Sequence, residues 1–163
     1  MNCQENLRNT PMQTKSKINS VETIAKTAYL EVVTLWEASV RATHHFLKEE
    51  DIAYFKPLIL NTYLDAVELR CVKNERQQII GFLGVAAQNL EMLFIHPEYR
   101  GQQIGKTLLL YAIEHLQVIK VDVNEQNEQA IGFYEHAGFR TKNRSEVDAS
   151  GKPYPILHME LKK

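Results

Sequence analysis

The stretch Glu91-Met-Leu-Phe-Ile-His-Pro-Glu-Tyr-Arg-Gly-Gln-Gln-Ile-Gly-Lys106 decides how the rest of the sequence is interpreted. Its apolar run predicts a strand that His96-Pro97 ends, and two glycines then lead into an expected helix from Ile104. The N-terminus of a helix presents free backbone N–H groups and the positive end of its dipole. Arg100 and Lys106 add positive charge on either side. The stretch therefore predicts a site for a phosphate-bearing ligand.

Two other readings of the loop remain open at this point. Gly101-Gln-Gln-Ile-Gly105-Lys106-Thr107 is close to a P-loop, but that motif needs four residues between its glycines and this chain has three. The usual companion motif, four apolar residues followed by Asp, is also missing. A nucleotide phosphohydrolase would bind ATP or GTP with magnesium. An ordinary strand–turn–helix connection with solvated charges would bind neither.

A second motif, Asn127-Glu-Gln-Ala-Ile-Gly-Phe-Tyr-Glu-His-Ala-Gly-Phe139, follows the expected helix over 104–116 and the expected strand over 118–123. Asn127, Ala130 and Tyr134 are spaced i, i+3 and i+7, so a helix carries all three on one face. Two turns, about 10 Å, separate the first from the last. The small Ala130 between them leaves room for an extended ligand arm. The alternative role for Tyr134 is a half-buried aromatic packing residue.

Both motifs resemble those of the GNAT superfamily of N-acetyltransferases. The segment 100–105 resembles its acetyl-CoA loop, Gln/Arg-x-x-Gly-x-Gly/Ala, and 127–139 resembles its pattern Asn-x-x-Ala-x-x-Phe-Tyr-x-x-x-Gly-Phe at every fixed position. One departure stands out, because the family usually has glycine where this chain has Gln103. The resemblance extends over about 21–161. Ala42-Thr-His-x-Phe-Leu47 looks like a bacterial subgroup whose substrate is poorly defined.

The resemblance implies an α+β fold, with a mixed, mostly antiparallel central sheet of six or seven strands and about four helices covering both faces. Hydrophobic periodicity predicts a matching order of elements. The expected strands are 21–26, 67–72, 78–87, 90–95, 118–123, 139–147 and 156–161, and the expected helices are 29–41, 48–63, 104–116 and 127–136. We expect one domain over 19–163, preceded by a mobile polar tail over 1–18.

The resemblance also implies that acetyl-CoA is bound as co-substrate. Main-chain groups of Leu93, Phe94 and Ile95 would pair with its pantetheine arm and polarise the thioester carbonyl. Asn127 would hydrogen-bond the same arm, and Tyr134 would protonate the departing thiolate. A phenol with a pKa near 10 stays protonated at pH 7 and can donate. Backbone amides of the loop would hold the pyrophosphate: Arg100, Gly101, Gln102, Gln103, Ile104, Gly105 and Lys106.

Glu91 is the candidate base, because many family members place an acidic residue here, acting directly or through water. Strand alternation predicts that Glu91, Leu93 and Ile95 point the same way. The alternative is a carboxylate that orders the sheet or faces solvent.

The acceptor wall is expected between the first two helices, where His44, His45 and Phe46 lie. Either histidine can titrate near neutrality, although loop histidines are more often solvated. His158, on the last expected strand, is a third candidate.

Composition excludes several classes of protein. The chain has 163 residues, of which 44% are apolar and 24% charged, and its net charge is −1. No basic surplus favours nucleic acid or anionic membrane. No apolar run approaches the roughly 20 residues that span a bilayer. Cys3 and Cys71 lie far apart with no metal-ligand spacing, which predicts no metal site and favours a reducing cytoplasm.

The sequence therefore predicts an acetyl-CoA-dependent N-acetyltransferase acting on a primary amine of a small molecule or peptide. No cysteine lies in the motif region, so we expect direct attack in a ternary complex and no acetyl-enzyme. The alternative is a non-catalytic acyl-CoA-binding sensor or interaction module on the same fold. A homodimer is common in the family.

Overall fold

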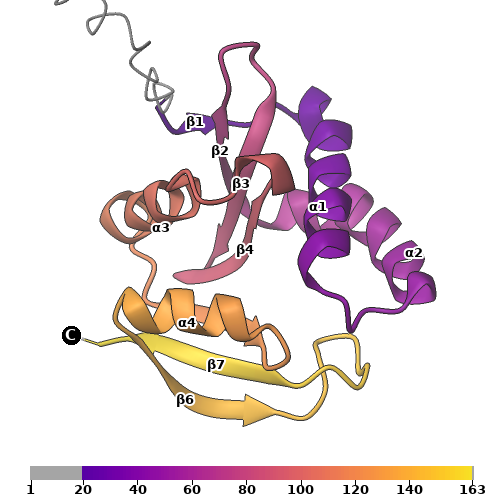
Figure 1. Cartoon of the computed structure of the whole chain (residues 1–163), viewed down its shortest axis with the longest axis vertical. Coiled ribbons are helices and arrows are strands. Elements are labelled where there is room, and N and C mark those ends of the chain that lie inside the picture. Colours follow the sequence, from indigo (N-terminus) through magenta and orange to yellow (C-terminus); the bar gives the residue numbers. More distant parts are fainter. Residues whose placement is uncertain (1–19, 163) are drawn as a thin grey trace, which may run out of the picture.

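The computed structural model describes residues 20–162, which form one seven-stranded sheet with helices on both faces (Figure 1). The predicted tail over 1–18 lies outside the described residues. The strands are β1 (Glu22–Thr23), β2 (Glu68–Lys73), β3 (Ile79–Ala86), β4 (Asn89–Ile95), β5 (Lys120–Asn124), β6 (Phe139–Ser145) and β7 (Ile156–Leu161). The helices are α1 (Tyr29–Thr43), α2 (Glu49–Leu58), α3 (Ile104–His115) and α4 (Glu128–His136).

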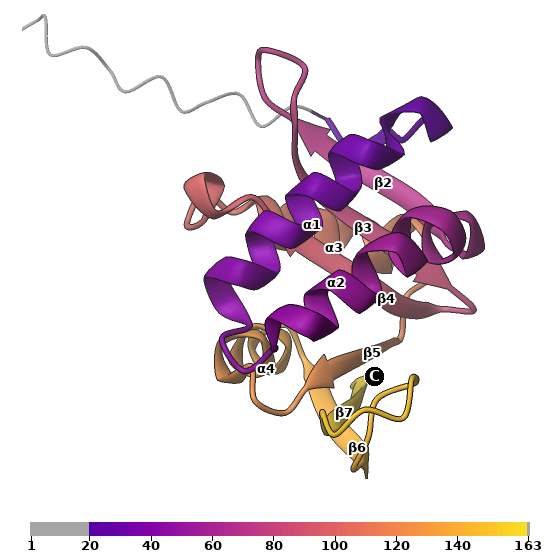
Figure 2. The same cartoon turned by 90° about the vertical axis from the view of Figure 1, so that its right-hand side faces the viewer.

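The sheet runs in the order β1-β2-β3-β4-β5-β7-β6, and only the β4–β5 pair is parallel. The predicted mixed, mostly antiparallel α+β fold is confirmed. One core packs between the sheet and α1 and α2, and a second packs against α3 and α4. Figure 2 shows α1 and α2 in front of β2, β3 and β4, while β5, β6 and β7 extend beyond them.

Most predicted elements match the structure to within two or three residues. The predicted first strand shortens to the two residues of β1. The predicted helix over 48–63 is α2 followed by a π-helical turn over Ile59–Tyr63. Pro57 lies in the last turn of α2, and its missing N–H removes one bond of the helical ladder just before the turn widens.

The sheet opens at its centre, between β4 and β5. These strands pair only at their first residues, Asn89 with Lys120 and Leu90 with Val121. Beyond that point β4 continues along β3 alone, so the backbone over 91–95 has no strand partner on its other edge. An open edge presents N–H and C=O groups that an extended ligand can pair with.

A β-bulge at Glu91 changes which way the residues of β4 point. Val85 pairs with Leu90 and Gly84 pairs with Met92, so Glu91 is the extra residue. Leu93 and Ile95 pack into the core with α3, as expected. Glu91 lines a cavity on the opposite face, together with Met92 and Phe94, which pack on the α1 and α2 side. The prediction that Glu91 shares a face with Leu93 and Ile95 is therefore wrong, because a bulge resets the alternation.

Candidate active site

The loop between β4 and α3 is built by a tight turn and two left-handed residues. His96 caps the short 3₁₀ turn Pro97–Tyr99, and its Nδ1 accepts a hydrogen bond from the Glu98 N–H at 3.2 Å. Gly101 and Gln103 then have φ values of +77° and +66°. Together these residues reverse the chain from the end of β4 into the start of α3.

The first turn of α3 leaves its backbone donors free. No side chain caps this helix, and its first turn contains no acidic residue. The first intrahelical bond at this end runs from the Thr107 N–H to the Gln103 carbonyl, at 3.0 Å. The N–H groups of Ile104, Gly105 and Lys106 therefore lack helical partners. This arrangement can hold an anion at the N-terminal end of the helix dipole.

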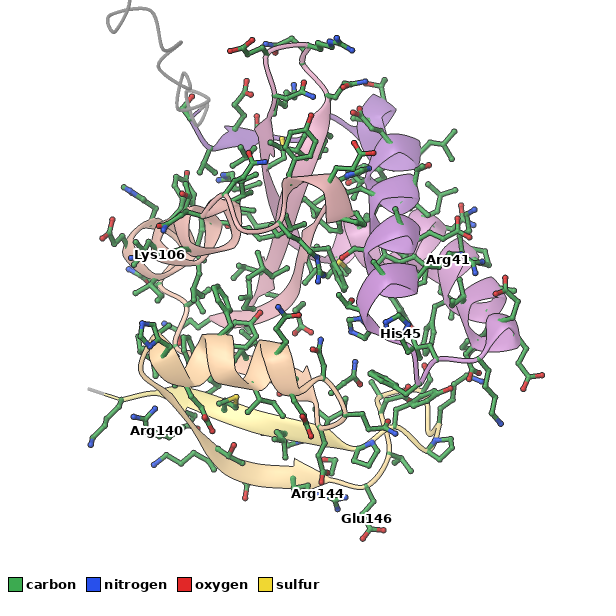
Figure 3. All side chains as sticks on the ribbon, in the orientation of Figure 1. Arg41, His45, Lys106, Arg140, Arg144 and Glu146 are labelled. Carbon is green, nitrogen blue, oxygen red and sulfur yellow. The ribbon has the colours of Figure 1, made fainter. Side chains whose placement is uncertain are left out.

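Three of the predicted loop residues, Gly105, Lys106 and Arg100, can be placed in the structure. A methyl group added at Gly105 would lie 3.6 Å from the ring of Phe133, so the start of α3 lies against α4. Lys106 and Arg100 are exposed. Figure 3 shows Lys106 on α3 and His45 at the end of α1, on opposite sides of the sheet.

Asn127 and Tyr134 lie at the two ends of α4. The Asn127 Oδ1 caps the helix by accepting a hydrogen bond from the Ala130 N–H at 3.2 Å, which leaves its side-chain amide N–H₂ available. Tyr134 is buried between the rings of Phe133 and Phe139. Burial raises the pKa of Tyr134, so its hydroxyl stays protonated at neutral pH and can act as a donor.

A cavity of about 720 Å³ lies on the α1 and α2 side of the sheet. Its walls are largely apolar, with Trp36 and Val40 from α1 and Phe94 from β4. Glu91 and Asp122 bring carboxylates to it from the two sides of the gap between β4 and β5. Glu91 is exposed and forms no hydrogen bond or ion pair with any residue of 20–162.

The three predicted acceptor-wall residues have different surroundings. His44 lines the cavity, and its Nδ1 lies 2.8 Å from the Thr43 Oγ1. Burial, with the charges of Arg100 and His45, lowers the pKa of His44 to about 4, so it is neutral at pH 7. His45 is exposed and does not line the cavity. Phe46 stacks against His44 instead, with ring centres 5.3 Å apart.

Two groups of polar contacts lie at the cavity. The β6–β7 connection reaches α2, where Lys152 Nζ lies 2.8 Å from the Asp51 Oδ1 and the Tyr154 hydroxyl donates to the same carboxylate. His158 hydrogen-bonds both Asp122 and Ser145. His158 is the third candidate of the sequence analysis, but no local signal in the sequence grouped it with Asp122 and Ser145.

Cys71 is a free thiol in β2, fully buried in the core under α1. Burial raises the pKa of Cys71 to about 11, so it remains a thiol at neutral pH. Among residues 20–162, no group of three His, Cys, Asp or Glu residues could hold a metal ion. Over the same range, no helix has the length and apolarity needed to cross a membrane.

Comparison with known proteins identifies the family. The model of the acetyltransferase (GNAT) domain matches residues 68–141. A peptidyl-lysine N-acetyltransferase, YjaB of Escherichia coli K12, is 42% identical over 129 residues, which are 79% of this chain and 87% of that protein. The solution structure of apo YjaB is similar with a TM-score of 0.79 at 39% identity, over 86% of this chain and 95% of that one.

A more distant structure shares the fold. The PaiA N-acetyltransferase of Thermoplasma acidophilum, determined in complex with coenzyme A, has a TM-score of 0.66 at 22% identity, over 88% of this chain and 98% of that one. The loop before α3, the gap between β4 and β5 and the comparisons all indicate the same family. The chain belongs to the GNAT family of N-acetyltransferases.

Proposed function

We propose that this chain transfers the acetyl group of acetyl-CoA to the side-chain amine of a lysine in a peptide or protein. The observation that carries the proposal is the gap between β4 and β5. On one side of the sheet lie the uncapped amides of α3, and on the other lies the 720 Å³ cavity. Two substrates that approach from opposite faces would meet at the open edge of β4.

The chain's own residues fit acetyl-CoA. The free amides over 104–106 suit the pyrophosphate, and the loop is open at Gly101, where an added Cβ would meet nothing within 4 Å. The open edge at Leu93, Phe94 and Ile95 suits the amide-bearing pantetheine arm. The same N–H groups would stabilise negative charge on the thioester oxygen during attack.

Tyr134 and Glu91 are proposed as the acid and the base. Tyr134 would donate its proton to the thiolate as coenzyme A leaves. Glu91 faces the cavity without a partner among the described residues, so it would attract an ammonium group and accept its proton, directly or through water. Cys71 is buried and protonated, which argues against an acetylated cysteine and for direct attack.

The cavity suits a lysine arm. Its apolar wall matches the four methylene groups of the side chain, and Glu91 and Asp122 match the ammonium at the end. YjaB is named a peptidyl-lysine N-acetyltransferase, which supports the same acceptor class. A free small amine would contact only Glu91 and Asp122, and would leave the apolar wall of the cavity without a partner. Action in the cytoplasm and formation of a homodimer stay predictions.

The test is acetyl transfer to a lysine-containing peptide, followed by mass spectrometry. We expect acetyl-peptide with the wild type and little with Glu91→Gln. Glu114→Gln, an exposed change on α3 outside the cavity, should retain activity. Calorimetry should detect acetyl-CoA and not ATP with magnesium. Acetyl-CoA binding without transfer to any amine would instead support the non-catalytic module.

A further inference from the structure

His44 lies at the C-terminal end of α1, with its ring beside the last residues of β4. It directly follows Thr43, the last residue of α1. Its ring centre lies 6.3 Å from that of Phe94 and 5.3 Å from that of Phe46. Besides burial, the charge of Arg100 in the loop after β4 lowers the pKa of His44. The imidazole therefore lies beside the part of β4 whose N–H groups are proposed to bind the thioester.

The hydrogen bonds of Thr43 fix which ring nitrogen of His44 carries the proton. The Thr43 Oγ1 lies 2.8 Å from the Ser39 carbonyl oxygen and 2.8 Å from the His44 Nδ1. A carbonyl oxygen can only accept, so the single hydroxyl proton of Thr43 is donated to Ser39. The Thr43 oxygen is then the acceptor toward His44, and Nδ1 must carry the ring proton. The neutral ring is left with a lone pair on Nε2.

The Nε2 atom of His44 is open to the cavity. It has no hydrogen-bond partner among residues 20–162. Over the same residues, no buried polar side-chain atom lacks a partner, so Nε2 is not buried. His44 lines the cavity, and Nε2 points away from α1 because Nδ1 points to Thr43. The lone pair on Nε2 is therefore free to accept a hydrogen bond from a ligand in the cavity.

Acetyl transfer treats the two N–H groups of a neutral lysine amine differently. One proton leaves once the nitrogen is bonded to the acetyl carbon, and Glu91 is its proposed acceptor. The other N–H stays and becomes the N–H of the acetylated product. A group that accepts a hydrogen bond from this N–H without taking the proton would hold the nitrogen and direct its lone pair toward the thioester. Such a group has to be neutral and only weakly basic.

We infer, on the basis of the proposed function, that the His44 Nε2 accepts a hydrogen bond from the N–H that the lysine nitrogen keeps, and that Thr43 is the positioning residue for His44. Burial, with the charges of Arg100 and His45, lowers the pKa of His44 to about 4. The ring is therefore neutral at pH 7 and too weak a base to remove the proton from an amine. It holds the nitrogen, while Glu91 acts as the base.

The consequence is a preference for unmodified lysine over N-methyl-lysine. A neutral N-methyl-lysine has a single N–H, and Glu91 must remove that proton during transfer. The methyl group then takes the place of the second N–H and faces Nε2 of His44. The hydrogen bond to His44 is lost for this substrate and kept for unmodified lysine.

The test compares kcat/KM of the full chain for two peptides that differ only in one lysine, unmodified or N-methylated. His44→Phe keeps an aromatic ring against Phe46 and Phe94 but removes the hydrogen-bond acceptor. It should lower kcat/KM for the lysine peptide by about 10-fold, the effect of one hydrogen bond, and change that for the methylated peptide by less than about twofold. His44→Gln offers an amide oxygen near the position of Nε2 and should recover part of the preference.

Two variants of Thr43 test its positioning role. Thr43→Val leaves the Nδ1–H of His44 without its partner, so it should weaken the preference for unmodified lysine. Thr43→Ser keeps the hydroxyl and should retain the preference. Nitrogen NMR of the wild type at pH 7 should show a proton on Nδ1 of His44 and none on Nε2, and this result does not depend on activity.

His115→Phe, on the exposed surface of α3, is the matched control and should leave kcat/KM for both peptides unchanged. Equal losses for the two peptides in His44→Phe would overturn the inference, because they would indicate a packing role. A wild type that acetylates both peptides equally well, or a proton on Nε2 of His44, would overturn it as well. Failure of the proposed function is read separately, as absence of acetyl-peptide with the wild type and the unmodified peptide.

Discussion

At the scale of single residues, Gln103 is the position where this chain departs from its family and where the backbone is left-handed. Its φ is +66°. A non-glycine residue there costs about 1–2 kcal/mol, and glycine loses roughly 0.5–1 kcal/mol through its greater freedom when unfolded. Gln103→Gly should therefore raise the free energy of unfolding by up to about 1 kcal/mol. Urea denaturation measures this change.

Gln117 offers a matched control, because it has a φ of +55° just after α3 and outside the loop. Gln117→Gly should raise stability in the same way. Only Gln103→Gly should also tighten acetyl-CoA binding, since it removes a side chain beside the proposed pyrophosphate site. Equal acetyl-CoA affinities in both variants would show that Gln103 does not crowd the cofactor.

Tyr134 gives the second prediction at this scale. Its hydroxyl forms no hydrogen bond with any residue of 20–162, so Tyr134→Phe should fold with an unchanged Tm. If the hydroxyl protonates the thiolate, kcat should fall by about 100-fold while the acetyl-CoA Kd stays the same. Stopped assays at saturating substrates measure the first quantity and calorimetry the second.

Tyr111→Phe serves as the control for Tyr134→Phe. The Tyr111 hydroxyl lies 3.4 Å from the Arg70 Nε, away from the cavity and the loop, so its loss should not change kcat. If Tyr134→Phe also retained the wild-type kcat, Tyr134 would be a packing residue and another donor would protonate the thiolate.

At the scale of elements, local patterns predicted the helices and the turn between β4 and α3. They work because a turn, a cap or a helical repeat is fixed by neighbouring residues, as Asn127 and Ala130 illustrate. The face of Glu91 was predicted wrongly, because a bulge depends on how β4 pairs with β3. Ser145 was missed for the same physical reason, since its direction depends on the bulge in β6.

The connection between β6 and β7 forms part of the wall of the cavity proposed to hold the acceptor. Lys152 pairs with Asp51 on α2 and also lies 4.5 Å from the ring centre of Tyr54. Lys152→Met should free this segment, raise the KM for a lysine peptide several-fold and leave the acetyl-CoA Kd unchanged. Hydrogen exchange over 148–155 should become faster in the same variant.

Lys142→Met, an exposed change in the bulge of β6, is the control for Lys152→Met. It should alter neither the peptide KM nor exchange over 148–155. An unchanged KM in Lys152→Met would mean that this connection does not shape the acceptor site.

At the scale of the whole molecule, the protonation state of the His44 side chain makes the free energy of unfolding depend on pH. Its pKa is lowered from 6.5 to about 4, so the unfolded chain binds a proton there that the folded chain does not. Stability is therefore lost as the pH falls from about 6.5 to about 4, by at most roughly 1.4 kcal/mol per pH unit. Urea denaturation at steps across this window should show the loss.

His44→Gln removes the titrating group and should flatten this part of the stability curve. The Asp51 carboxyl does not interfere, because its hydrogen bonds with Lys152 and Tyr154 lower its pKa below 3.8, outside the window. The same slope in His44→Gln as in the wild type would contradict the assignment.

The architecture joins two chemical environments through one gap. The amides of α3 and the side chain of Tyr134 lie toward one face, and Glu91, His44 and Asp122 lie toward the other. The gap between β4 and β5 connects them because these strands pair at only two positions. This geometry favours simultaneous binding of two substrates and direct transfer between them.

The most direct measurement is the initial rate of lysine-peptide acetylation over a grid of acetyl-CoA and peptide concentrations. Double-reciprocal lines that intersect, with acetyl-peptide as the product, are the predicted result, because both substrates must be bound before transfer. Parallel lines would indicate an acetylated enzyme and contradict direct attack. Absence of acetyl-peptide at every point, despite bound acetyl-CoA, would contradict the proposed function itself.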